Sequence, residues 1–163
     1  MAKQINFYST KDPFGEFSNF AQYPINIGGI EYQTTEHFFQ AMKFATHPPS
    51  MKVVMEAATP MEAAKLGRDR SKPLRRDWEE AKHGIMMDAL RAKFTQHPEL
   101  KRLLLSTGDD HLVEHTKNDN YWGDGGDGSG QNMLGRMLVQ LRHELRQAQL
   151  PFVVVSKMAV AGL

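Results

Sequence analysis

The chain has 163 residues, a length that suits one domain with one hydrophobic core. Apolar residues make up 40% and charged residues 24%, as in ordinary soluble globular proteins. The formal net charge of +1 is too small for a general nucleic-acid-binding surface. Cysteine is absent, which excludes disulfides, thiolate metal ligands and a cysteine nucleophile, and which fits a reducing cytoplasm.

Neither end of the chain carries a recognisable targeting or membrane segment. Residues 1–10 lack the basic and then apolar layout of a signal peptide. The apolar stretch at residues 150–163 is too short to span a bilayer and is interrupted by polar residues. We expect a cytoplasmic protein with no membrane partner, with one domain over residues 1–150. Residues 151–163 are expected to form a C-terminal tail, as a strand or a loosely held terminus.

Strands are predicted at the start of the chain. Residues 4–9 are rich in Phe and Tyr, which favour strands. Residues 23–33 predict a hairpin, because apolar residues alternate on both sides of Gly28-Gly29, a dipeptide typical of tight turns. Thr34-Thr35 then begins a helix, with Glu36 near the positive end of its dipole.

Helix start and stop signals predict four further helices, at residues 59–67, 77–96, 98–105 and 131–148. The first two begin with capping boxes, at Thr59-Pro60-Met61-Glu62 and Asp77-Trp78-Glu79-Glu80. In the last helix, Leu and Met recur every three or four residues. A short strand is predicted at residues 112–116. Several helices around a small β-sheet indicate a single α+β domain in which helix predominates.

A polar stripe runs along the helix that begins at Thr35. Because positions i, i+4 and i+7 share a helix face, Glu36, Gln40 and Lys43 stack on one side. Such a stripe is commonly the solvated face of a helix. The other interpretation is a catalytic face of carboxylate, amide and amine, in which a lysine among apolar side chains loses its proton and becomes a nucleophile.

Residues 123–130 hold five glycines, two aspartates and one serine, directly before the last predicted helix. Gly-rich loops at helix N-termini can bind phosphates or sugars through free backbone N–H groups. A mobile surface loop is the other interpretation. The preceding aromatic pair Tyr121-Trp122, together with the upstream acids Glu114 and Asp119, favours a site.

Residues 67–76 form the one basic cluster, with five cations among the nine residues 68–76. Arginine can bind a phosphate through two parallel hydrogen bonds. A solvated loop is the alternative. Because the net charge is near zero, a local phosphate pocket is favoured over a nucleic-acid track.

Two metal-site patterns are present but lack the required context. His111-Leu112-Val113-Glu114-His115 matches H-x-x-E-H, a zinc-protease motif that requires a helix and a third ligand. Turn-forming residues flank it on both sides and leave too little room for a helix. Residues 125–130 nearly match a calcium-binding turn, but Gly130 stands where an aspartate is required. We therefore predict no metal site and no cofactor.

Five motifs, taken together, resemble the YbiA/RibX family of the NADAR superfamily. They follow one another in that family's order and spacing over nearly the whole chain, from about Ile5 to Ala148. The motifs are Ile5-Asn6-Phe7-Tyr8-Ser9, Glu16-Phe17-Ser18-Asn19-Phe20, residues 35–44, Gly67-Arg68-Asp69-Arg70 and Tyr121-Trp122-Gly123-Asp124-Gly125-Gly126.

The resemblance implies an N-glycosidase. YbiA-like members are associated with hydrolysis of the ribosylamine bond in phosphorylated riboflavin-pathway intermediates, and an older description of them is swarming motility. Other branches remove ADP-ribose from guanine bases. The residues expected to be catalytic are Glu36, Lys43, Asp119 and Trp122, of which Lys43 matches a lysine proposed to form a Schiff base with the sugar. The residues expected to bind the substrate are Ser18, Asn19, Phe20, Gln40, Arg68, Gly123, Asp124, Gly126 and Asn132.

These residue types suit that chemistry. Cleavage of a C–N glycosidic bond develops positive charge at C1 of the ribose, which the carboxylate of Glu36 or Asp119 can stabilise, and an acid must protonate the leaving base. A neutral Lys43 can instead capture C1 as an imine that water later releases. Trp122 offers a flat face for the base or the sugar cation. Arg68 and the Gly-rich loop are expected to hold the 5′-phosphate.

Two classes of function remain open. The first is a metal-independent N-glycoside hydrolase whose partner is a small phosphoribosyl substrate or an ADP-ribosylated guanine nucleotide. The second is a module that binds ADP-ribose or a nucleotide without turnover. The presence of Glu36, Lys43 and Asp119 together favours the enzyme, because a binding module does not need all three.

Overall fold

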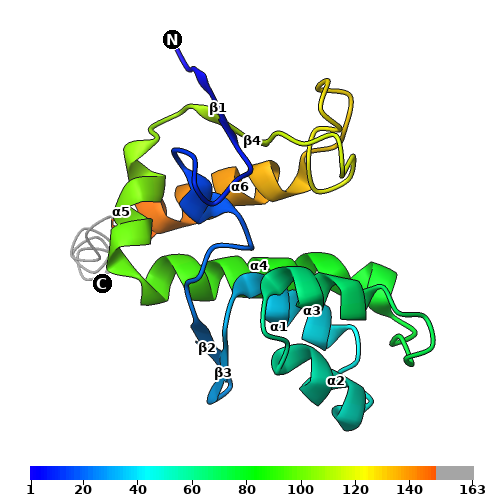
Figure 1. Ribbon diagram of the computed structural model, residues 1–163. Helices are drawn as coiled ribbons and strands as arrows, with labels where there is room; N and C mark the ends of the chain where they lie inside the picture. The colour runs from blue at the N-terminus through cyan, green and yellow to red at the C-terminus, as the bar shows by residue number, and fades with distance from the viewer. Residues whose placement is uncertain (150–163) are drawn as a thin grey trace, which may run out of the picture.

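The computed structural model describes residues 1–149 (Figure 1), so the predicted tail at 151–163 lies outside the described residues. The elements in chain order are β1 (Gln4–Phe7), a 3-10 turn η1 (Gly15–Phe17), β2 (Ile25–Ile27), β3 (Ile30–Tyr32), α1 (Thr35–Met42), α2 (Pro48–Met55), α3 (Pro60–Gly67), α4 (Trp78–Gln96), α5 (Pro98–Ser106), β4 (His111–Glu114) and α6 (Met133–Ala148). The expected α+β fold with a predominance of helix is confirmed. Within the described residues, no helix has both the length and the apolar character needed to cross a membrane.

The strands form two separate two-stranded sheets. β1 pairs in parallel with β4, from Gln4 opposite His111 to Phe7 opposite Glu114. β2 and β3 form the predicted hairpin, whose turn residues Gly28 and Gly29 have φ values of 64° and 81°. Left-handed backbone at both turn positions suits glycine, which has no Cβ to clash.

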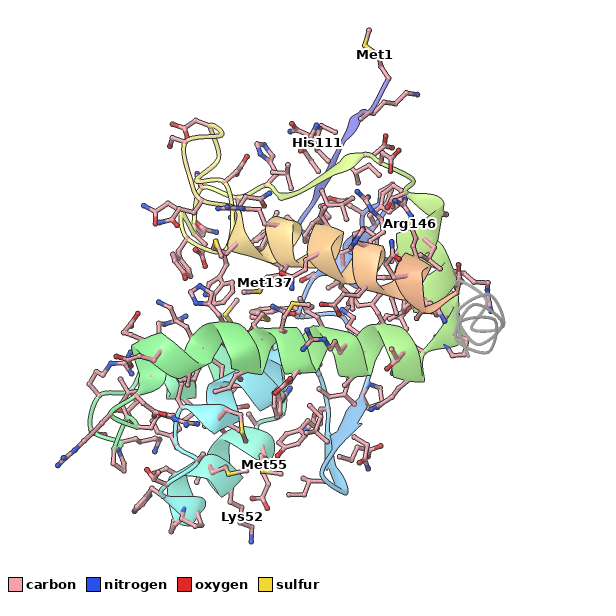
Figure 2. All side chains as sticks on the ribbon, turned by 180° about the vertical axis from the view of Figure 1, so that it is seen from behind. Met1, Lys52, Met55, His111, Met137 and Arg146 are labelled. Carbon is pink, nitrogen blue, oxygen red and sulfur yellow. The ribbon has the colours of Figure 1, made fainter. Side chains whose placement is uncertain are left out.

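Helix α4 lies in the middle of the molecule (Figure 1). One hydrophobic cluster, which includes Leu90 and Phe94 of α4, packs against β1, β4, α5 and α6. A second cluster, which includes Ala89 and Ala92, packs against α1, α2, α3 and the β2–β3 hairpin. Figure 2 shows Met137 of α6 pointing toward α4. Because α4 is covered on both sides, it joins the two halves of the structure.

The helix starts test the capping predictions. The Thr34 hydroxyl accepts from the His37 N–H and the Thr59 hydroxyl accepts from the Glu62 N–H, so α1 and α3 begin as expected. The capping box at Asp77 is wrong in detail, although α4 does begin at Trp78. The Asp77 carboxylate instead binds the Arg75 guanidinium at 2.6 and 2.9 Å, a charge-assisted pair that competes with the helix N–H groups.

One helix and two element boundaries differ from the sequence prediction. Helix α2 was not predicted, because its first turn contains Pro48 and Pro49 and its N-cap is His47, whose ring Nδ1 accepts from the Ser50 N–H. The last helix begins at Met133 rather than residue 131, since Asn132 is left-handed at φ 50°. The strand expected at residues 112–116 lies at His111–Glu114.

Two helical glycines allow a matched test of packing. A Cβ on Gly135 of α6 would lie 2.0 Å from the Leu112 carbonyl oxygen of β4, whereas a Cβ on the exposed Gly84 of α4 meets nothing within 4 Å. Alanine gains about 1 kcal/mol of helix propensity at either position. We expect Gly84→Ala to stabilise the protein by about that amount, and Gly135→Ala to destabilise it by about 1–3 kcal/mol through overpacking. Urea unfolding measures both, and equal stabilisation by the two variants would contradict close α6–β4 packing.

Candidate active site

The polar stripe of α1 is buried. The exposed fractions of Glu36, Gln40 and Lys43 are 8%, 7% and 7%. The solvated-face interpretation is therefore wrong. The stripe faces α3 and the loop that follows it, because Gln40 packs on Gly67 and the Lys43 Nζ donates to the Gly67 carbonyl oxygen at 3.4 Å.

Glu36 is the buried carboxyl group of this stripe. Burial raises its pKa, while the hydrogen bond from Gln40 and the positive charges of Lys43 and Arg68 oppose that rise. The Gln40 Nε2 donates to the Glu36 Oε1 at 2.8 Å. The charge of Asp119 raises the pKa further. Glu36 therefore has both a hydrogen-bond donor and two cations that favour its carboxylate form.

Lys43 sits at the C-terminal end of the stripe among aromatic rings. Its Nζ lies 5.5 Å from the ring centroid of Trp78 and 5.9 Å from that of Phe39. Burial lowers the pKa of Lys43 to about 8, with Arg70 acting in the same direction and Glu36 opposing. At pH 7 roughly a tenth of the lysine is then a neutral amine. Phe44, the next residue in the sequence, does not belong to this group of rings, because it packs in the second hydrophobic cluster.

Asp119 and Trp122 come to this stripe from the Gly-rich segment. The Asp119 Oδ1 accepts from the N–H groups of Tyr121 at 2.9 Å and Trp122 at 2.8 Å, which fixes the turn before the glycines. The Trp122 ring packs edge-on against Phe39 of α1 at 5.4 Å between centroids. The structure thus brings together the four residues that were predicted to be catalytic: Glu36, Lys43, Asp119 and Trp122.

Asp124 organises the Gly-rich loop. It is 5% exposed, its Oδ1 accepts from the N–H groups of Thr116 and Gly126, and its Oδ2 is hydrogen-bonded to the His115 ring at 2.8 Å. Gly123 packs closely on the carbonyl oxygens of Asp119 and Glu114, and Gly126 packs on Lys117. These contacts account for the loop's shape, so the substrate-binding role of these three residues stays a prediction.

Asn132 connects the end of this loop to β4. Its Oδ1 accepts from the Glu114 N–H at 3.0 Å and its Nδ2 donates to the Leu112 carbonyl at 2.9 Å. The side-chain amide therefore behaves as an extra strand partner along the edge of β4. Its expected contact with substrate stays a prediction.

The segment Ser18–Asn19–Phe20 holds the N-terminus of α1. The Asn19 carbonyl accepts from the Glu36 N–H at 3.2 Å, and its Oδ1 accepts from the Thr35 hydroxyl at 2.8 Å. Ser18 in turn uses its carbonyl to accept from the fully buried Lys93 at 2.8 Å. Phe20 is half-buried. This segment positions Glu36, and its direct contact with substrate is untested.

The basic segment after α3 supplies positive charge beside Glu36 and Lys43. Arg68 is exposed, yet its charge lowers the pKa of both Glu36 and Lys43. The Arg70 Nη1 donates to the Gly67 carbonyl at 3.0 Å. An exposed guanidinium next to a buried carboxylate and amine suits the predicted grip on a phosphate.

Glu114 was noticed in the sequence only as a nearby acid. It ends β4, it is half-buried, and burial raises its pKa to about 8, with Asp119, Glu36 and Asp124 acting in the same direction. Among residues 1–149 no hydrogen bond or ion pair involves its carboxyl group. Glu114 lies near Glu36 in the structure, but the two residues are too far apart in sequence for this to be predicted.

The H-x-x-E-H motif does not form a zinc-protease site. His111–Glu114 is a strand paired with β1, not a helix, so His111 and Glu114 point to opposite faces. In the part of the chain that the structure describes, no three His, Asp or Glu side chains lie close enough to hold a metal ion.

Comparisons with known proteins extend over almost all of the described residues. The NADAR domain model matches residues 6–146. The chain is 55% identical over 141 residues to N-glycosidase YbiA of Escherichia coli (strain K12), covering 86% of this chain and 88% of that protein. It is 41% identical over 155 residues to the riboflavin biosynthesis protein PYRR, chloroplastic, of Zea mays, covering 86% of this chain and 25% of that protein.

A solved structure agrees with the fold. The NMR structure of the E. coli protein YbiA matches this one with a TM-score of 0.84 at 52% identity, over 92% of this chain and 89% of that chain. With the motifs in their expected order and the predicted residues gathered around α1, these matches show that the chain belongs to the NADAR domain family.

Proposed function

We propose that this protein is an N-glycosidase that hydrolyses the C–N bond between a phosphorylated ribose and a heterocyclic base. The single observation that carries the proposal is the burial of Lys43, with its lowered pKa, two helical turns from Glu36 on the same face of α1. The names of its relatives, N-glycosidase YbiA and a riboflavin biosynthesis protein, support this reaction. They also favour phosphoribosylamino-pyrimidine intermediates as substrates. A cytoplasmic location is part of the proposal and fits the absence of cysteine.

The reaction proceeds through the lysine. The neutral amine of Lys43 attacks C1 as the C1–N bond breaks, with the bonding electron pair leaving on the base. The sugar ring opens to an imine on Lys43, and water then releases ribose 5-phosphate. The carboxylates of Glu36 and Asp119 stabilise positive charge at C1, and Trp122 provides a flat wall beside it.

Turnover of two substrate classes tests the activity. Incubation with 5-amino-6-(5-phosphoribosylamino)uracil is expected to release ribose 5-phosphate, measured by coupled assay or mass spectrometry. ADP-ribosylated guanosine in a parallel reaction tests the other branch of the family. Saturable binding of either compound, with no product after prolonged incubation, would instead establish a binding module.

Trapping by borohydride tests the role of Lys43. Reduction during turnover should leave a ribose-phosphate adduct on the peptide that contains Lys43, detected by intact-mass and peptide mass spectrometry. Lys43→Arg should abolish the adduct, since a guanidinium stays charged. The matched control Lys65→Arg, on the exposed side of α3, should keep it. Consumption of substrate without any adduct would favour direct attack by water, assisted by Glu36 or Asp119.

The pH dependence follows from the lowered pKa. Because only the neutral amine attacks, single-turnover rates should rise as the pH increases from 6 toward about 8, the pKa of Lys43 in the folded protein. A lysine with its ordinary pKa would shift this limb upward to about 10.4. A rate independent of pH between 6 and 9 would therefore contradict the amine as nucleophile.

Arg68 should recognise the 5′-phosphate. We expect Arg68→Ala to weaken binding of a phosphorylated substrate about ten- to a hundredfold, from loss of a charge-assisted hydrogen bond, and to leave the dephosphorylated analogue nearly unaffected. Arg76→Ala, an exposed arginine of the same basic segment, is the matched control. Equal weakening of both ligands by Arg68→Ala would assign that residue to another part of the site.

A further inference from the structure

Three carboxyl groups, those of Glu36, Asp119 and Glu114, lie near one another, and their surroundings differ. Glu36 accepts a hydrogen bond from Gln40 and faces the charges of Lys43 and Arg68. The Asp119 Oδ1 accepts two backbone N–H groups. Glu114, by contrast, lies within reach of the like charges of Glu36, Asp119 and Asp124, and no hydrogen-bond donor in the described residues reaches its carboxyl group. Burial raises the pKa of both Glu36 and Glu114, but Glu114 alone of the three has no hydrogen-bond donor in the described residues to favour its ionised form.

The backbone of Glu114 is fixed on three sides. It pairs with Phe7 of β1, its N–H donates to the Asn132 Oδ1 at 3.0 Å, and its carbonyl accepts from the Asp124 N–H at 2.9 Å. A Cβ on Gly123 would lie 2.9 Å from the same carbonyl oxygen, so the Gly-rich loop packs directly on this residue. The structure therefore holds the start of this side chain rigidly while leaving its carboxyl group unpaired.

The strand geometry directs that carboxyl group toward the site. Alternate residues of a strand share a face, so Glu114 lies on the same side of β4 as Leu112, which is 2% exposed and belongs to the cluster that includes α4. Phe39 of α1 belongs to the same cluster, and Trp122 packs against it, so this cluster extends from β4 to α1. Glu114 thus lies on the β4 side of the site, close enough for the charges of Glu36 and Asp119 to act on it.

We propose that Glu114 is the general acid of the reaction, an inference that rests on the proposed N-glycosidase function. Its carboxyl proton passes to the nitrogen of the leaving base as the C1–N electron pair moves onto that nitrogen and the Lys43 Nζ bonds to C1. Water then hydrolyses the imine and leaves an ammonium on Lys43. That ammonium releases a proton to solvent and the Glu114 carboxylate takes one up, which restores both groups for the next turnover.

Leaving-group dependence distinguishes this role from a structural one. Glu114→Gln should lower turnover of the phosphoribosylamino-pyrimidine by about two to four orders of magnitude, because an amide cannot supply the proton. It should lower turnover of p-nitrophenyl ribofuranoside 5-phosphate less than about tenfold, because this leaving group needs no protonation. Glu36→Gln should slow both substrates. Glu31→Gln, on the exposed face of the β2–β3 hairpin, should slow neither.

The pH profile provides a second readout. Wild-type kcat should fall as the pH rises above about 8, where Glu114 loses its proton, and Glu114→Gln should lack that alkaline limb. Carboxyl carbon-13 NMR of the wild type needs no variant to fold, and it should show a glutamate that titrates above pH 7 and disappears in Glu114→Gln.

The outcomes separate the two proposals. A wild type that hydrolyses the pyrimidine substrate, with Glu114→Gln slowing both substrates equally or neither, would overturn the general acid and keep the N-glycosidase. Ionisation of every glutamate below pH 7 would also overturn the general acid. Failure of the wild type to hydrolyse either substrate would overturn both proposals.

Discussion

The burial of charge along one face of α1 is the constraint on which the rest of the site depends. Glu36 and Lys43 are both more than nine-tenths buried, and an ionised group in such surroundings is unfavourable unless partners compensate it. Gln40 and the charge of Arg68 stabilise the Glu36 carboxylate only in part, and the Gly67 carbonyl does the same for the Lys43 ammonium. The pKa of Glu36 is therefore raised and that of Lys43 lowered, which favours the neutral form of each group. Complete pairing would stabilise the fold more and leave the amine protonated.

The surrounding elements keep α1 in this unfavourable position. The Asn19 carbonyl holds its first turn, and Phe39 packs against Trp122 of the loop. On the remaining side, a Cβ on Gly67 would lie 1.8 Å from the Gln40 Oε1, so α3 approaches as closely as only glycine permits. That oxygen has no hydrogen-bond partner in the described residues. Close packing around an incompletely satisfied polar stripe is typical of functional sites.

The features that the sequence predicted well are local ones. The caps at Thr34 and Thr59 and the glycine pair of the hairpin act within a few residues, so composition reveals them. The predicted capping role of Asp77 is wrong because its carboxylate binds the guanidinium of Arg75 instead of the helix N–H groups. The burial of the α1 stripe could not be predicted locally, because it depends on contacts with α3. The position of Glu114 beside Glu36 could not be predicted either, because it depends on the pairing of strands that are far apart in sequence. The family resemblance predicted which residues form the site, but it could not show that Asp119 and Asp124 accept hydrogen bonds from backbone N–H groups of the Gly-rich segment and the residues before it.

The parallel pairing of β1 with β4 has a consequence for how the protein is made. Partners in this sheet, such as Gln4 and His111, are separated by 107 residues, and the connection between them contains five of the six helices found in residues 1–149. Such long-range pairing is entropically costly to close and slow to form. On the ribosome, β1 emerges before β4 and stays unpaired until the five helices between them have been synthesised. The helices can form during that interval, but the end of β4 takes its place beside Glu36 only after all five of them have been synthesised.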